Sequence, residues 1–243
     1  TNKKADSYYA KDPAVVKAGD YYYMVYTGST TVVETTDNEL FVARSATPDG
    51  KNWEKWNGSS WGGDPAPAVD AELSATETFF GAGEPSLVVK GDQIYLYYTY
   101  SDNEQGIYNV RLMTAAASDP NWPASMTDQG EVIDRTAFKG LNVDGCSVRY
   151  IEDQDCFQAV HGVNIADVNS YSVVWVSKDG VSGWEQKGLL SNNIRVRAKY
   201  ARFICNEQSH ITSTTPRLMI YQNGGQYSKT AWPTRMVPYS FVE

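Results

Sequence analysis

The order of apolar and polar positions repeats along the chain. Residues 12–27 read DPAVVKAGDYYYMVYT, and residues 84–99 read EPSLVVKGDQIYLYYT. Each segment holds an acid and a proline, a short apolar run, a Gly-Asp pair and a tyrosine-rich run. Two such runs on either side of a Gly-Asp pair predict a β-hairpin with a tight turn. A weaker copy, DGCSVRYIEDQDCFQAV, begins at Asp144, and its turn falls at Glu152-Asp153.

A third strand follows each hairpin. Three apolar runs have the required length and position, namely ELFVARS (39–45), NVRLMTAAAS (109–118) and SYSVVWVS (170–177). Each run is followed by a turn and then a tryptophan, and these are Trp53, Trp122 and Trp184. We expect the tryptophans to pack between neighbouring units, because large rings fill such interfaces. A fourth and fainter unit comprises YARFICN (200–206), RLMIYQN (217–223) and the C-terminal TRMVPYSFVE.

The period of the repeat predicts the fold. The first two units start 72 residues apart and the next two start 60 apart. Units of three to four antiparallel strands with this period predict an all-β protein, a β-propeller that occupies residues 1–243 as a single domain. A β-sandwich or a trefoil explains neither the period nor the acid at the start of each unit. The first strand of each propeller blade lines the central channel, so Asp12, Glu84 and Asp144 should meet at its mouth.

Composition and charge narrow the range of partners. A net charge of −8 argues against nucleic acid, which favours a basic face. Because no stretch approaches ~18 apolar residues, we expect no membrane span. The 17 tyrosines and 7 tryptophans offer rings that can stack on sugars. The chain starts without an apolar signal segment, as in a processed protein or a trimmed one, and we expect a secreted or periplasmic monomer.

Few other chemistries are compatible with the sequence. Cys146, Cys156 and Cys205 are an odd set with irregular spacing, unlike a zinc site or a disulfide scaffold. We expect buried thiols, although a bridge between Cys146 and Cys156 stays open because a hairpin would place them on adjacent strands. The sequence lacks the G-x-S-x-G, H-E-x-x-H and phosphate-loop motifs. With only two histidines, a histidine-based zinc enzyme or a Ser-His-Asp hydrolase would be difficult to build.

The repeated phrases resemble those of a known enzyme group. The stretch DPAVVKAGDYYYMVYT looks like the first-blade signature of five-bladed β-propeller glycosidases, the superfamily of glycoside hydrolase families 43, 32, 68, 62 and 117. The stretch GAGEPSLVVKGDQIYLYYT is similar to sequences of family 43-like members. The resemblance implies five blades and gives Asp12 the place of the general base or nucleophile. The chain departs from the pattern in two ways: four units are visible, and the acids run Asp, Glu, Asp instead of Asp, Asp, Glu.

The three acids supply the groups that glycosidic cleavage needs. One carboxyl group must protonate the leaving oxygen, while another activates water or attacks the sugar. We assign Asp12 as the base, Glu84 as the acid and Asp144 as the group that raises the pKa of the acid and anchors a sugar hydroxyl. Acids in these places can instead cap turns at strand entrances, although glutamate is a poor turn residue. A non-catalytic, lectin-like propeller is therefore the alternative function, and a protein-interaction scaffold is a third.

Further residues are candidates for contact with a carbohydrate substrate. They are Tyr8 and Tyr9 just before the first acid, Phe80 before the second, His161 at the end of a strand of the third unit, and Arg202 in the fourth unit. The rings can stack on the apolar face of a sugar or plug the space between blades. Arg202 can bind a carboxylate on an acidic sugar. We expect no required cofactor and no catalytic metal. The resemblance allows a structural calcium in the channel, near a histidine such as His161.

Overall fold

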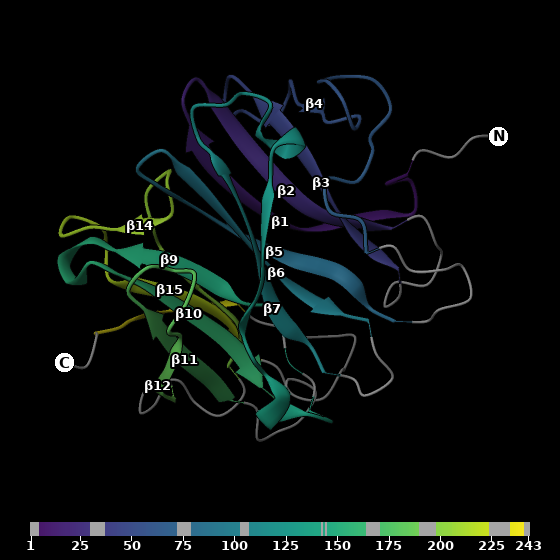
Figure 1. Cartoon of the computed structure of the whole chain (residues 1–243). Coiled ribbons are helices and arrows are strands. Elements are labelled where there is room, and N and C mark those ends of the chain that lie inside the picture. The colour runs from purple at the N-terminus through teal and green to yellow at the C-terminus, as the bar shows by residue number, and fades with distance from the viewer. Residues whose placement is uncertain are drawn as a thin grey trace.

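The described residues form four antiparallel blades (Figure 1), the first two of which are joined into one sheet by a single parallel contact between Asn38 and Gly81. The first strand of each blade lines one central pocket, which we call the channel. This computed structural model describes residues 5–29, 37–71, 79–102, 107–141, 143, 145–163, 171–189, 198–223 and 234–240. The all-β propeller class predicted from the repeats is confirmed. Within the described residues the only helical segments are three short 3₁₀ turns, η1 (Trp122–Ala124), η2 (Thr136–Phe138) and η3 (Glu152–Gln154).

Each blade corresponds to one repeat of the sequence. Blade 1 comprises β1 (Tyr9–Ala18), β2 (Tyr21–Ser29), β3 (Asn38–Ser45) and β4 (Glu54–Lys55). Blade 2 comprises β5 (Gly81–Lys90), β6 (Gln93–Ser101), β7 (Asn109–Ala116) and β8 (Thr127–Ile133). Blade 3 comprises β9 (Ser147–Ile151), β10 (Cys156–Val163), β11 (Tyr171–Ser177) and β12 (Glu185–Leu189). Blade 4 has three strands, β13 (Ala198–Phe203), β15 (Leu218–Asn223) and β16 (Thr234–Pro238), while β14 (His210–Ile211) pairs with β9.

The Gly-Asp pairs form the turns of the first two hairpins. Ala18 pairs with Tyr21 across the first turn, and Lys90 pairs with Gln93 across the second. Gly19 and Gly91 have φ angles of +55° and +59°, a left-handed conformation that glycine adopts without steric cost. This is the two-residue turn that matches the right-handed twist of the strands, so the predicted hairpins are confirmed.

Apolar side chains fill the space between neighbouring blades. Trp122 is fully buried between blades 1 and 2, and Trp184 packs on the cluster between blades 2 and 3. The prediction for these two tryptophans is confirmed. Trp53 holds the corresponding place on blade 1, where it packs with Tyr26 and Phe41 of the same blade and borders a pocket of about 270 Å³.

The fifth blade implied by the resemblance is not found among the described residues, which form four. The pocket beside Trp53 is lined by residues of blade 1 alone. Among the described residues, only blade 1 and the residues just before it pack on this side of Trp53. Among all described residues, no helix has the length and apolar character needed to cross a membrane.

A segment of blade 4 closes one end of the channel. Residues 206–211, which we call the floor segment, present three consecutive carbonyl oxygens to the ends of β1, β5 and β9. Their bonded pairs are Lys17 N–Glu207 O at 2.8 Å, Val89 N–Gln208 O at 3.0 Å and Tyr150 N–Ser209 O at 3.2 Å. We call this end of the channel the floor and the opposite end, where β1 and β5 begin, the mouth.

Candidate active site

Asp12 and Glu84 occupy the same unusual backbone position in neighbouring blades. Each lies in a β-bulge near the start of its inner strand, between Lys11 and Ala14 in β1 and between Gly83 and Ser86 in β5. Their φ angles are +52° and +53°. Left-handed backbone is rare for residues other than glycine, and strain of this kind collects at functional sites. Both bulges place an acid near the start of an inner strand, at the mouth end of the channel.

Thr27 of β2 ties the two bulges together. Its backbone pairs with Lys11, next to Asp12, and its fully buried hydroxyl accepts a 2.8 Å hydrogen bond from the backbone N–H of Glu84. Asp12 is exposed and Glu84 is half-buried. Thr27 of blade 1 therefore helps to fix the backbone position of the acid of blade 2.

The third blade approaches Glu84 through a glycine. A Cβ atom added to Gly145 would lie only 2.7 Å from the Cβ of Glu84 and 3.3 Å from its carboxylate carbon. Such a contact is closer than side chains tolerate, so this approach requires glycine. Asp144, the residue before Gly145, lies outside the described residues, and its role as the third acid stays a prediction.

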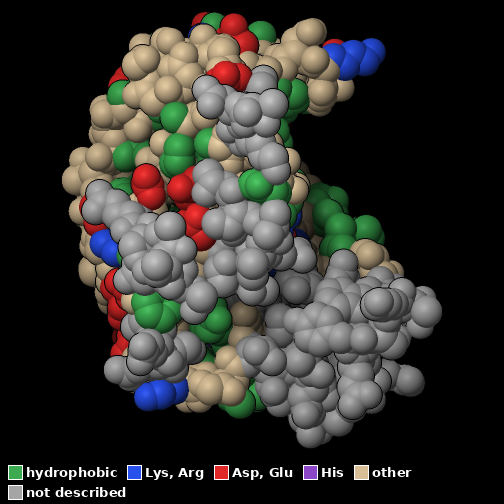
Figure 2. Space-filling view, turned by 90° about the vertical axis from the view of Figure 1, so that its right-hand side faces the viewer, with side chains coloured by type: hydrophobic (Ala, Val, Ile, Leu, Met, Phe, Trp, Pro, Cys, Tyr) green, Lys and Arg blue, Asp and Glu red, His purple; other side chains and the backbone are tan. Residues whose placement is uncertain are grey.

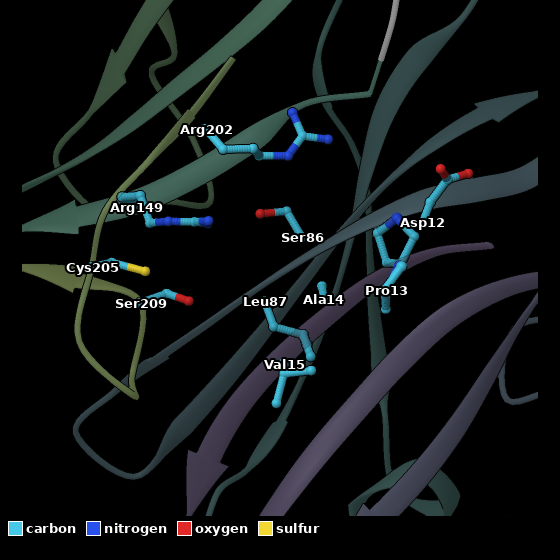
Figure 3. Close-up of a pocket in the computed structure, with 11 residues that line it drawn as sticks. Asp12, Pro13, Ala14, Val15, Ser86, Leu87, Arg149, Arg202, Cys205 and Ser209 are labelled. Carbon is cyan, nitrogen blue, oxygen red and sulfur yellow. The ribbon is translucent and has the colours of Figure 1, made fainter. Parts of the chain in front are cut away.

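A pocket of about 550 Å³ runs along the channel below the bulges. Its lining includes Asp12 near the mouth and Ser209 from the floor segment (Figure 3). Arg149 of β9 and Arg202 of β13 enter it from the side opposite Asp12 and Pro13. Of the substrate ligands expected from the sequence, the structure places Arg202 in this pocket. The sequence did not predict Arg149 as a pocket residue. The one feature that could have indicated it is its position in the inner strand of the third repeat.

Aromatic rings lie near Glu84. Phe80 and Tyr108 are both half-buried and meet edge to face, with ring centroids 5.5 Å apart. Burial raises the pKa of Tyr108, and the negative charge of Glu84 raises it further. Tyr8 and Tyr9 are half-buried at the start of β1, where Lys11 lies over the ring of Tyr9 at 5.3 Å. No pattern in the sequence pointed to Tyr108, because it does not stand next to one of the repeated acids.

His161 lies away from the pocket. It is 1% exposed and packs between Phe138 and Trp175, and neither ring nitrogen has a hydrogen-bond partner among the described residues. Burial lowers the pKa of His161, and the charge of Arg135 acts in the same direction, so the imidazole is neutral. Contact with substrate would require movement of the surrounding rings, and the expected role of His161 in substrate binding stays a prediction.

Glu39 is a buried acid at the mouth that the sequence did not single out. Its backbone pairs with Gly28, its side chain is 7% exposed, and no described residue hydrogen-bonds to its Oε2 atom. Burial raises the pKa of Glu39 to about 7, and the charges of Asp70 and Asp37 contribute. Figure 2 looks onto the mouth, and acidic side chains predominate over basic ones among its coloured atoms.

The channel pocket does not fit the calcium ion that the resemblance allows. Calcium needs roughly six to eight oxygen ligands, many of them carboxylates. The pocket offers one carboxylate, Asp12, and two guanidinium groups. Among the described residues no cluster of three or more His, Cys, Asp or Glu side chains could hold a metal. Cys146, Cys156 and Cys205 are free thiols.

Comparison with known proteins gives a match in structure only. No protein-family model and no curated protein sequence matches the chain. Zg3597, a family 117 glycoside hydrolase of Zobellia galactanivorans, superposes with a TM-score of 0.63 at 12% identity over 94% of this chain and 66% of that one. Bacteroides ovatus Xyloglucan PUL GH43B gives a TM-score of 0.61 at 12% identity over 96% and 40%.

A third enzyme agrees with these two. The endo-arabinase of Bacteroides thetaiotaomicron has a TM-score of 0.59 at 14% identity, with 95% of this chain and 75% of that one covered. The chain thus spans between two fifths and three quarters of the length of these enzymes. At such identities the likeness concerns the fold. The chain has the β-propeller fold of family 117 and family 43 glycoside hydrolases.

Proposed function

We propose that this protein is a glycoside hydrolase that cleaves a polysaccharide or oligosaccharide at the mouth of the channel. The matched left-handed bulges carry the proposal, because they set a carboxyl group at the same place in two neighbouring blades. Turn capping alone does not require a glutamate in left-handed backbone. The fold shared with glycoside hydrolases supports the same reaction class.

The roles of the acids follow from their surroundings. Asp12 is exposed, which suits a base that must reach water or the anomeric carbon. Glu84 is half-buried beside Gly145, which suits an acid that holds a proton for the leaving oxygen. A negative charge on Asp144 would favour the protonated form of Glu84. Phe80 and Tyr108 would form an aromatic wall for the sugar ring.

The reaction transfers one proton in each direction. Glu84 gives its proton to the glycosidic oxygen as the bond to the anomeric carbon breaks. Asp12 either removes a proton from the attacking water or attacks the anomeric carbon itself, in which case water later releases the sugar. In the first case Asp12 ends protonated and Glu84 ionised, and proton exchange with solvent restores both groups. In the second case Glu84 takes a proton from the water that releases the sugar, so both groups regain their initial states. Either route consumes one water molecule.

Hydrolysis of a panel of aryl glycosides and polysaccharides tests the proposal. The wild type should release sugar, and Glu84→Gln should lower the rate by at least about a hundredfold, the usual contribution of a general acid. Glu54→Gln is the matched control, since Glu54 is exposed in blade 1 and pairs with Arg44. Circular dichroism and thermal unfolding would show whether each variant is folded.

A second outcome would support the lectin-like alternative. If the wild type releases nothing from the panel but binds a sugar saturably in calorimetry, the carboxyl groups act as ligands for hydroxyl groups. An unchanged rate of hydrolysis in a folded Glu84→Gln variant would contradict the assignment of the acid.

A further inference from the structure

Two arginines occupy equivalent positions on adjacent inner strands. Arg149 of β9 donates a hydrogen bond to the carbonyl oxygen of the preceding residue at 2.6 Å, and Arg202 of β13 does the same at 3.0 Å. Both guanidinium groups point into the channel pocket (Figure 3). The repeat of the sequence thus presents two cations to one cavity.

Neither arginine has an acidic partner among the described residues. Within the described part of the chain, no carboxylate forms an ion pair with Arg149 or Arg202, whereas Arg44, Arg111 and Arg217 each have one. Within the described residues, the buried Nε of Arg149 has no hydrogen-bond partner. Burial lowers the pKa of Arg149, Cys205 acts against this through its charge and a hydrogen bond, and the charge of Arg202 lowers the pKa further. Two cations that repel each other in a cavity favour a bound anion.

The remaining lining of the pocket is compatible with an oxyanion. Ser86, Ser209 and the Cys205 thiol are the other polar side chains besides Asp12. Ser86 is 3% exposed, and its Oγ atom accepts a 2.9 Å hydrogen bond from the backbone N–H of Val148. The chain carries 21 Lys and Arg residues against 29 Asp and Glu residues. Two arginines in one pocket are therefore not the result of a general excess of basic residues.

We propose that Arg149 and Arg202 bind the anionic group, a carboxylate or a sulfate, of an acidic saccharide. The inference rests on the proposed function and names its substrate class. The pocket connects the arginines with Asp12 at the mouth, so one saccharide would place its anionic group below and its scissile bond between the carboxyl groups. A guanidinium group binds carboxylate and sulfate oxygens through two parallel hydrogen bonds.

Calorimetric binding separates this inference from hydrolysis. The probes are glucuronate, galacturonate and galactose 6-sulfate, each beside its neutral parent sugar, with sodium acetate and sodium sulfate as simple anions. The wild type should bind at least one acidic sugar about tenfold or more tightly than its parent, and more tightly than the simple anions. This affinity should fall as salt is added.

Variants assign the effect to the pocket. Arg202→Gln should lower the affinity for the acidic sugar at least about tenfold while leaving that for the neutral parent unchanged. Arg235→Gln removes the same charge from an exposed position on β16 of the same blade and should change neither affinity. If Arg202→Gln does not fold, a competition experiment on the wild type takes its place. Added sulfate should then raise the apparent dissociation constant of the acidic sugar.

Three results would overturn the inference. Equal binding of acidic and neutral sugars, or no binding of any acidic sugar, removes the anionic substrate class. Binding of acidic sugars no tighter than that of acetate or sulfate means a simple anion site. In each case loss of neutral-glycoside hydrolysis in Glu84→Gln would still support the proposed glycosidase, so the two proposals fail separately.

Discussion

The mouth and the floor of one channel differ in how their polar side chains are paired. At the floor, charged side chains are paired: Lys90 with Asp155, His210 with Glu152, and Arg217 with Asp153. Near the mouth, the buried Oε2 of Glu39 and both nitrogens of His161 have no hydrogen-bond partner in the part of the chain that the structure describes. Buried polar groups without partners cost about 1–3 kcal/mol each.

The backbone differs between the two ends. The floor segment joins three blades through three consecutive carbonyl oxygens in regular hydrogen bonds, although Ser209 itself has a left-handed φ angle of +65°. At the mouth, the two left-handed acids each lie in a β-bulge near the start of an inner strand. The floor therefore secures the blades, and the bulges of the mouth interrupt the strand pairing at matched positions. Stability and activity should respond to changes at different ends of the channel.

The largest effect is expected from Gly145→Ala at the mouth. The added methyl group would lie 2.7 Å from the Cβ of Glu84, so the backbone of one of the two must move. Displacement of a catalytic group by about 1 Å can cost about a hundredfold in rate. We expect at least this loss of hydrolysis and a fall of about 2 kcal/mol in the free energy of unfolding.

A double mutant tests the cause of that loss. In the Glu84→Gly background the Cβ partner is gone, so Gly145→Ala should cost clearly less in urea unfolding than it does in the wild type. Equal costs in both backgrounds would show that Gly145 is needed for a reason other than Glu84.

The pH dependence of stability should report on Glu39. An unfolded glutamate ionises near 4.5, and burial raises the pKa of Glu39 to about 7, so the folded state holds the extra proton between these values. The free energy of unfolding therefore falls as pH rises through this window, by about 3 kcal/mol in total. Urea unfolding from pH 4 to 8 should show this fall in the wild type, and Glu39→Gln should lack it. A retained slope in Glu39→Gln, with Glu54→Gln as control, would assign it to another group.

His210→Ala should weaken the floor without changing the mouth. The imidazole lies 2.9 Å from Glu152 Oε1 and also contacts the carbonyl oxygen of Val89, so it links blades 2 and 3. Its loss should cost about 2 kcal/mol in urea unfolding and leave hydrolysis by the folded protein unchanged. Gln208→Ala is the control, because it keeps the backbone bond to Val89. A drop in activity in folded His210→Ala would show that the two ends are coupled.

The smallest effect is expected from Lys17→Met. The ion pair of Lys17 with Glu207 is 3.7 Å long, and its side chains are 38% and 53% exposed. Such pairs contribute at most about 1 kcal/mol, and the backbone bond between the same residues remains. We expect a change below about 0.5 kcal/mol in thermal or urea unfolding. A larger loss would mean that the floor depends on charge more than on backbone hydrogen bonds.

Much of the fold could be predicted because local chemistry repeats. The Gly-Asp turns and tyrosine-rich strands specify hairpins without distant partners, and the period of the units specifies blades. The place of Trp53 shows the limit of this reasoning. The position of Trp53 in its repeat predicts a contact between blades. Whether another blade packs against Trp53 depends on how all the blades are arranged.

The candidate site was predictable only in part. Asp12 and Glu84 stood out because each opens a repeat, whereas nothing local marked Arg149, Tyr108 or Glu39. Arg149 and Arg202 lie 53 residues apart in the sequence and share a pocket only because β9 and β13 line one channel.

The sequence by itself determined the hairpins, the period and the first two acids, since turn geometry and strand alternation act over a few residues. The tertiary structure alone decided the left-handed conformation of both acids, the buried and unpaired state of Glu39, and the meeting of two arginines. These features depend on which surfaces the blades bury against one another. Burial and unscreened charge are properties of the packed ring, because they arise from contacts between residues far apart along the chain.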